Sequence, residues 1–164
     1  MRLKMLPVAL IISVALFTGC TSQPTQVDVP PNNSLLKQAQ DQLPFKIVMP
    51  SSLPHDMELK EVLVGVDPNT GKPNSVNLSF ASADNKYIFD VREEKGDKLR
   101  HLGWPSDKSE KEVTLNNSNA KFRKDEKLAI IHWTNGEILF TVQVGAGSDL
   151  ASEEALVEIA NRFK

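Results

Sequence analysis

The chain contains a single cysteine, Cys20, and this residue limits how the rest of the sequence can be stabilised. With one cysteine among 164 residues, no disulfide can form within the chain. A small domain without disulfides gains its stability from the burial of apolar side chains. We therefore expect the residues after Cys20 to form a domain held together by its core.

The residues before Cys20 have the layout of a secretory signal peptide. Arg2 and Lys4 are positive, and Leu6–Phe17 is an apolar run of 12 residues that leads into two small residues. As a helix this run would span roughly 18 Å, whereas the apolar core of a bilayer is about 30 Å thick. The run is too short for a comfortable permanent span. The alternatives to a lipoprotein signal are an uncleaved N-terminal anchor and an ordinary signal peptide with an incidental cysteine.

The sequence Phe17-Thr18-Gly19-Cys20 resembles the lipobox of bacterial lipoproteins. In that family the cysteine thiol receives a diacylglyceryl group, and the cysteine becomes the new N-terminus. The lipobox usually has leucine where this chain has Phe17. The resemblance implies that Cys20 is the lipidation site and binds membrane lipid through its acyl chains. It places the protein on the extracytoplasmic side of the cell membrane, or in an outer membrane if the cell is Gram-negative.

Composition divides the remaining chain into two parts. Removal of residues 1–19 takes away Arg2 and Lys4, so the formal net charge falls from −2 to −4, which argues against nucleic acid as a partner. Residues 20–33 contain three prolines and almost no large apolar side chain, so we predict a disordered tether. Residues 34–164 have the size of a single globular domain.

Apolar periodicity predicts a helix, a series of strands and a final helix in this domain. The predicted helices are Ser34–Leu43 and a C-terminal one that Ser152 caps, with a long polar loop over 92–111. The predicted strands cover 45–48, 57–66, 76–80, 87–91, 113–115, 120–122, 128–133 and 138–144. We expect an α+β fold, with a twisted, mostly antiparallel, half-barrel-like sheet and the C-terminal helix packed on one face.

Two glycine-containing segments have alternative interpretations as ligand loops. Gly145-Ala146-Gly147-Ser148 lies where a phosphate loop would lie, but it lacks the lysine and third glycine of such loops. Asp67-Pro68-Asn69-Thr70-Gly71 begins like a calcium loop, but its twelfth position is Leu78 instead of an acid. We predict a turn at both places.

No catalytic or metal-binding cluster stands out in the sequence. The three histidines, His55, His101 and His132, are scattered singly, and we expect His132 on the rim of the sheet. Glu93-Glu94 and Glu153-Glu154 are interpreted as solvated charges. We expect no enzyme activity, no cofactor and no metal site.

Trp104 is the residue in which we expect a partner or ligand contact. It lies in Leu102-Gly103-Trp104-Pro105, within the predicted polar loop, and tryptophan is a common anchor in binding surfaces. The alternative is that its ring folds back and covers the open end of the sheet.

A set of folding motifs resembles the DUF4367 family, bacterial extracytoplasmic domains of unknown function. The motifs are Phe45–Pro50, Leu53-Pro54, the Val76–Phe80 strand, Ile131–Gly136 with Leu139-Phe140, and the helix with Glu154-Ala155-Leu156 and Ile159-Ala160. The resemblance implies a lipoprotein or membrane-anchored domain. Together with the lipobox it suggests a non-catalytic ligand-binding or sensing domain that takes an apolar ligand or peptide, or alternatively a structural lipoprotein that docks on another envelope protein.

Overall fold

A computed structural model describes residues 34–96 and 110–164 of the protein. Its helices are α1 (Ser34–Gln40), α2 (Glu153–Ala160) and a short 3-10 helix, η1 (Pro54–Asp56). Its strands are β1 (Glu58–Val66), β2 (Pro73–Ala81), β3 (Ile88–Lys95), β4 (Lys111–Thr114), β5 (Asn119–Lys124), β6 (Leu128–Asn135) and β7 (Ile138–Gly145). The predictions for Cys20, His101 and Trp104, and those for the signal peptide and tether, lie outside the described residues.

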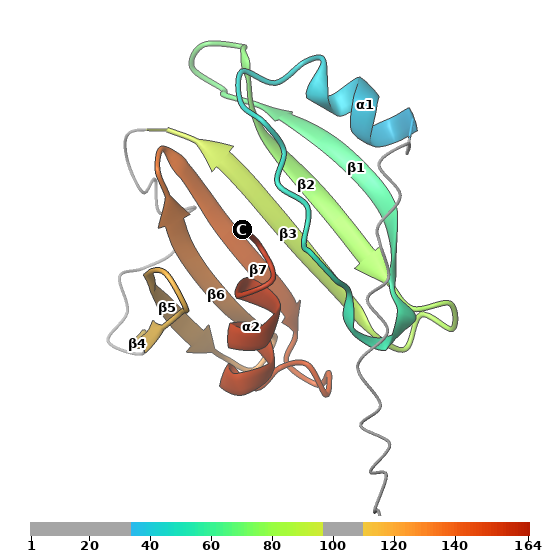
Figure 1. Ribbon diagram of the computed structural model, residues 1–164, viewed down its shortest axis with the longest axis vertical. Coiled ribbons are helices and arrows are strands. Elements are labelled where there is room, and N and C mark those ends of the chain that lie inside the picture. The colour runs from blue at the N-terminus through green and yellow to red at the C-terminus, as the bar shows by residue number, and fades with distance from the viewer. Residues whose placement is uncertain (1–33, 97–109) are drawn as a thin grey trace, which may run out of the picture.

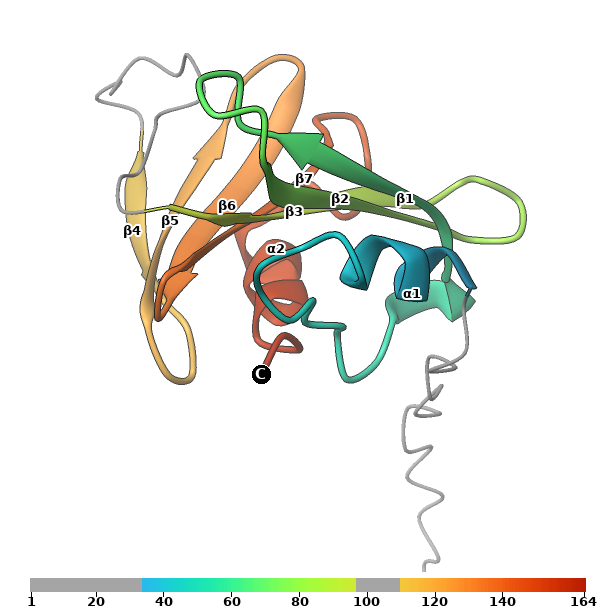
Figure 2. The ribbon, with the colours of Figure 1, turned by 90° about the horizontal axis from the view of Figure 1, so that it is seen from above.

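The seven strands form one sheet in the order β1-β2-β3-β7-β6-β5-β4, and all neighbouring strands are antiparallel. Two meanders make up this sheet, one of β1–β3 and one of β4–β7, and the pairing of β3 with β7 joins them (Figure 1). Figure 2 shows that the sheet is curved and that α1 and α2 lie on the same side of it. The predicted antiparallel sheet with a C-terminal helix is confirmed.

Alternation of apolar and polar residues places one face of the sheet in the core. Val76, Leu78 and Phe80 of β2 are fully buried, as period-two alternation requires. Residues of both meanders and of α2 belong to a single buried cluster. The predicted strands of this region are therefore confirmed in their positions, within a few residues at the ends.

Polar residues form the turns and caps that the sequence predicts. The segment from Asp67 to Lys72 closes the β1–β2 hairpin, with the Asp67 N–H donating to the Lys72 carbonyl at 2.8 Å. Gly71 has a φ of 66°, which glycine adopts without strain. At the start of α2 the Ser152 side chain accepts from the Ala155 N–H at 3.1 Å. The predicted turn and N-cap are both confirmed.

The prediction of a strand at Phe45–Val48 is wrong. Residues 45–51, which we call the strap, pass over the helix-bearing side of the sheet without joining it as a strand (Figures 1 and 2). Side chains, and no strand ladder, hold it to α1 and the sheet. Gln40 donates to the Phe45 carbonyl and accepts from the Ile47 N–H, and the Glu93 carboxylate accepts from the Val48 N–H. A short alternating run becomes a strand only where it runs along a sheet edge, and the strap instead crosses the face of the sheet over Glu93 of the central strand β3.

The predicted loop over 92–111 is wrong at both ends. β3 continues to Lys95 and β4 begins at Lys111. The interpretation of Glu93 as a solvated charge is also wrong, because its exposed fraction is 0%. Glu93 lies on the same face as Phe89 and Val91, since alternate residues of a strand share a face.

Candidate functional site

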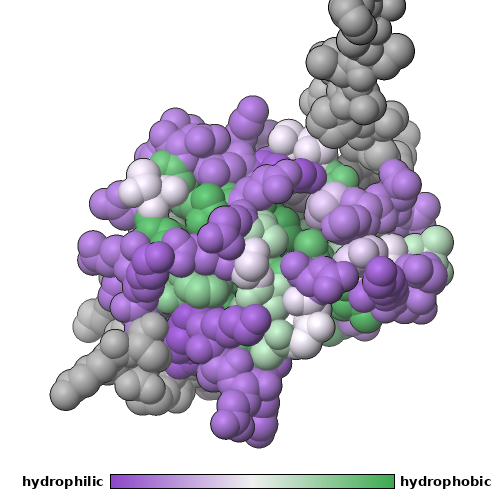
Figure 3. All heavy atoms as spheres, turned by 90° about the horizontal axis from the view of Figure 1, so that it is seen from below, coloured by the Kyte–Doolittle hydropathy of each residue, from purple (hydrophilic) through white to green (hydrophobic). Residues whose placement is uncertain are grey.

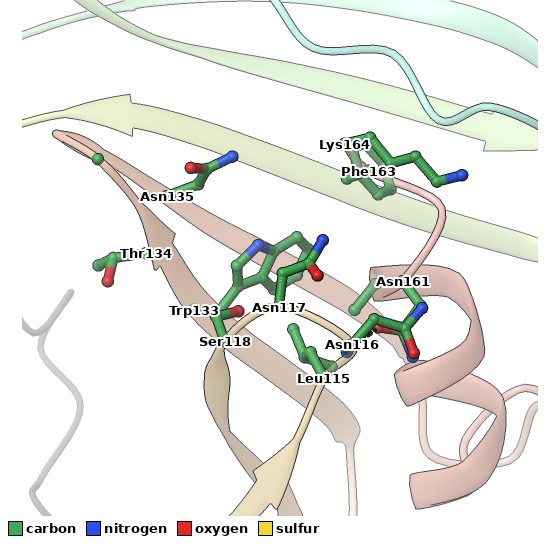
Figure 4. A pocket seen from close by; sticks show the side chains of 12 residues that line it. Leu115, Asn116, Asn117, Ser118, Trp133, Thr134, Asn135, Asn161, Phe163 and Lys164 are labelled. Atoms are coloured by element: carbon green, nitrogen blue, oxygen red, sulfur yellow. Dashed lines mark hydrogen bonds between the residues drawn. The ribbon is translucent and has the colours of Figure 1, made fainter.

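A pocket of about 450 Å³ opens where three segments of the second meander and its helix meet (Figure 4). The first segment is the β4–β5 turn, residues 115–118, and the second is the end of β6 with Gly136. The third is the chain that leaves α2, residues 160–164. The order β7-β6-β5-β4 brings these segments together, although they lie far apart in the sequence.

The floor of the pocket is apolar and rigidly packed. Leu115, Trp133 and Phe163 line it and are buried. The Trp133 ring stacks on Phe140 with centroids 5.1 Å apart and an interplanar angle of 10°, and the Phe163 ring meets Trp133 edge-on at 6.0 Å. Such aromatic packing fixes the rings in one arrangement, so the floor is preformed.

The rim of the pocket consists of uncharged polar side chains. Asn116 and Asn117 come from the β4–β5 turn, Asn135 from the end of β6 and Asn161 from the end of α2. The turn is closed by the Leu115 N–H, which donates to the Ser118 carbonyl at 2.8 Å.

A further hydrogen bond fixes this turn to α2. The Asn116 N–H donates to Asn161 Oδ1 at 2.8 Å. The bond holds two walls of the pocket at a set distance from each other.

The pocket is nearly free of charge. Among its twelve lining residues Lys164 is the sole one with an ionisable side chain, and it is exposed. The lining contains hydroxyls of Ser118 and Thr134 besides the four amides. Amides and hydroxyls both donate and accept hydrogen bonds, so the lining can pair with neutral polar groups.

Glu93 is a second unusual group, and the strap connects it to the pocket. Burial raises the pKa of Glu93 to about 8, although the hydrogen bond from the Val48 N–H lowers it in part. That N–H lies 3.2 and 3.1 Å from the two carboxyl oxygens. The strap then continues to Pro50, which forms a bridge with Phe163 of the pocket floor.

The remaining predicted residues are not brought together into a site. His55 stacks on Tyr87 with ring centroids 3.9 Å apart. His132 lies beside a smaller hollow of about 150 Å³. Glu153 pairs with Lys111 at 2.8 Å. Within residues 34–96 and 110–164, no three metal-ligating side chains form a group.

Sequence reasoning missed the asparagines of the rim and the burial of Glu93. Asn116-Asn117-Ser118-Asn119 is dense in turn-forming residues, which predicts a hairpin turn. It does not indicate which other segments lie beside that turn. The burial of Glu93 had a clearer signal, because the residues two and four positions before it are apolar.

Comparisons with known proteins place the chain in no family. No protein family model matches it, and no curated protein is similar to it. In the part of the chain that the structure describes, none of the helices has the length and apolar character needed to cross a membrane. A crystal structure of a GTP binding regulator from Thermotoga maritima is similar at 15% identity over 68% of this chain and 81% of the other, with a TM-score of 0.43.

Proposed function

We propose that the protein is a bacterial lipoprotein, anchored by acylated Cys20 on the extracytoplasmic side of the membrane, whose domain binds a ligand without catalysis. The observation that carries the binding part is the pocket of about 450 Å³ with a rigid aromatic floor and a polar rim. Small-molecule sites have volumes of about 300–1,000 Å³ and combine apolar surface with a few polar groups. The lining offers amides, hydroxyls and ring surface, which are groups that bind and orient a ligand.

We infer a half-barrel sheet with α2 packed on its concave face, as the resemblance to DUF4367 implies. Supporting observations are the curvature of the sheet in Figure 2 and the burial of Leu156, Ile159 and Ala160 on one side of α2. In this arrangement the pocket lies where the helix and the sheet diverge.

The anchor is supported by the sequence before the domain. The lipobox-like Phe17–Cys20 precedes residues 20–33, whose composition suits a tether between lipid and domain. We expect Cys20→Ser to abolish acyl labelling and to remove the protein from the membrane fraction, whereas Ser22→Ala, a change two residues later, leaves both unchanged. Retention of Cys20→Ser on the membrane would contradict the lipid anchor and favour an uncleaved N-terminal anchor.

The binding role has its own test. Asn117 is an exposed residue of the rim, so Asn117→Trp should fill the pocket without disturbing the core. We expect native mass spectrometry of the protein extracted from membranes to show a bound small molecule on the wild type and none on Asn117→Trp. Asn69→Trp, in the exposed β1–β2 turn, is the matched control. An equal amount of bound small molecule on all three proteins would contradict a role for this pocket.

A docking role is the second candidate, and strand β1 favours it. β1 is an edge of the sheet, and its Leu63 and Val66 have exposed fractions of 51% and 58%. Figure 3 shows hydrophobic groups gathered near the middle of the face seen from below, within a hydrophilic margin. A partner strand could add to such an edge. The irregular register of β1 at Leu59/Glu61 and Gly65/Val66 works against it, because bulges hinder strand addition.

The two candidates are separated by a charge placed on the edge. Leu63→Lys should abolish docking on another envelope protein and leave the pocket unaffected. Chemical cross-linking in native membranes, followed by mass spectrometry, measures the docking. If Leu63→Lys loses a cross-linked protein that Asn117→Trp retains, the docking role is supported over the binding role.

A further inference from the structure

We propose that the pocket binds a neutral saccharide, the N-acetylated or plain pyranose units of a glycan chain. This inference rests on the proposed function and specifies the class of ligand. Three features of the lining carry it: side-chain amides that are unengaged, an aromatic floor, and the near absence of charge.

The amides of the rim can each donate and accept hydrogen bonds. Within the described residues the side chains of Asn117 and Asn135 take part in no hydrogen bond, while Asn161 uses its oxygen and keeps its amino group. A sugar hydroxyl also donates and accepts, so an asparagine amide can pair with two adjacent hydroxyls of one ring. Amides on three sides of the pocket can therefore contact successive positions around a pyranose.

The floor offers a small apolar surface to the C–H side of a sugar, because Trp133 and Phe163 line the pocket with exposed fractions of 5% and 8%. Trp133 lies at the bottom of the pocket and is held by Phe140 and Phe163. A pyranose has a face of C–H groups, which contacts an aromatic π-system favourably. Indole Nε1–H is a further donor, and within the described residues it makes no hydrogen bond.

The same lining disfavours the other ligand classes. A phosphate or other strongly anionic group is usually held by several Arg or Lys side chains, and the lining has Lys164 alone. A divalent metal cation is usually held by at least one carboxylate, and no Asp or Glu is among the twelve lining residues. An acyl chain could form no hydrogen bond with the amides and hydroxyls of the lining, so these groups would not contribute to its binding.

The binding experiment uses the full-length protein in a zwitterionic detergent, since detergents with sugar headgroups would compete. The readout is the indole N–H signal of Trp133 in ¹H–¹⁵N NMR spectra, distinguished from the second tryptophan, Trp104, by a Trp104→Phe variant. The probes are N,N′-diacetylchitobiose, maltose, sodium decanoate and trialanine, each added up to the order of 10 mM.

We expect at least one disaccharide to shift the Trp133 signal. The double variant Asn117→Ala/Asn135→Ala should raise its Kd about tenfold, because each amide loses hydrogen bonds to hydroxyls. Asn69→Ala should keep the Kd of the wild type, and unchanged thermal unfolding of the double variant should exclude misfolding.

Each other outcome overturns the proposal in a recognisable way. If decanoate or trialanine shifts the Trp133 signal and both saccharides do not, the pocket binds a ligand but the saccharide class is wrong. If no probe shifts the signal, the saccharide proposal is overturned and the binding role of the pocket loses its support. If a disaccharide shifts the signal equally in the double variant, the rim amides do not recognise it.

Discussion

The two meanders of the sheet are covered in different ways. Over β1–β3 lie α1 and the strap, and polar contacts hold the strap: Gln40 bonds to it twice and the Glu93 carboxyl accepts from Val48. Over β4–β7 lies α2 with the chain that follows it, and Phe163 packs there against Trp133 and Phe140. The first half is covered through partly buried hydrogen bonds and an ionisable group, besides apolar side chains such as that of Ile47. The second half is covered through aromatic rings.

This difference implies that the stability of the two halves of the sheet depends differently on pH. Aromatic packing does not depend on pH, so the pocket floor should keep its form as the pH changes. The strap depends on a carboxyl group whose burial favours the protonated form. Substitutions in the two halves should therefore differ in how their effect on stability depends on pH.

Phe163→Ala should cause the largest loss in the aromatic half. Removal of a buried phenyl ring that contacts both Trp133 and Phe140 should lower the free energy of unfolding by about 3–5 kcal/mol. The loss should be the same at pH 5 and pH 8, as chemical denaturation can measure. The adjacent exposed change Lys164→Ala should stay within about 0.5 kcal/mol. A strongly pH-dependent loss of stability for Phe163→Ala would contradict the claim that the aromatic half is stabilised independently of pH.

Glu93→Gln, in the half that the strap covers, should remove a pH dependence of the free energy of unfolding. The pKa of Glu93 is raised from 4.5 to about 8, so between these values the folded protein keeps a proton that the unfolded chain releases. Wild-type stability should therefore be full below pH 4.5 and fall as the pH rises towards 8. The variant, which keeps an acceptor for the Val48 N–H, should be more stable than the wild type at pH 8 by about 4 kcal/mol and equal to it near pH 4.5.

The control for this prediction is Glu61→Gln on the exposed edge strand β1. The free energy of unfolding, measured by chemical denaturation from pH 4.5 to 8, should change with pH in the same way for the control and the wild type. If the free energy of unfolding of Glu93→Gln has the same pH dependence as that of the wild type, the buried carboxyl does not titrate in this range.

Gln40→Ala should weaken the strap at its other attachment. Its Nε2–H donates to the Phe45 carbonyl at 2.8 Å and its Oε1 accepts from the Ile47 N–H at 2.9 Å. The loss of both bonds should cost about 1–2 kcal/mol without pH dependence, and hydrogen exchange at Ile47 should accelerate. Gln38→Ala, exposed on the same helix, should leave both quantities unchanged.

Ser152→Ala should have the smallest effect of the four. It removes the side-chain oxygen that accepts from the Ala155 N–H, and a lost N-cap costs about 1 kcal/mol. Ser152→Asp retains an acceptor and should keep wild-type stability. If thermal unfolding shows equal losses for both variants, the cap does not act through this hydrogen bond.

The sequence predicts the sheet better than what covers it. In β2 the alternation of Val76, Leu78 and Phe80 with polar residues reports directly on which face is buried. Phe45–Val48 has the same alternation, but whether it pairs as a strand depends on whether it runs along an edge of the sheet or across a face. That information lies in the strand order and not in the segment itself.

The candidate site could not be predicted for a related reason. Asn117 and Asn135 each appear in the sequence as ordinary turn residues. They become parts of one rim because β5 pairs with β6 and because Asn161 fixes the β4–β5 turn to α2. The sequence directed attention instead to Cys20 and Trp104, whose roles stay predictions.

The central claim is a ligand-binding domain held to a membrane by one lipidated cysteine, and intact mass spectrometry of the membrane-extracted protein tests it most directly. The account predicts a chain that begins at Cys20 and carries the added mass of a diacylglyceryl group on that residue. The mass of the whole chain from Met1, with an unmodified Cys20, would contradict it.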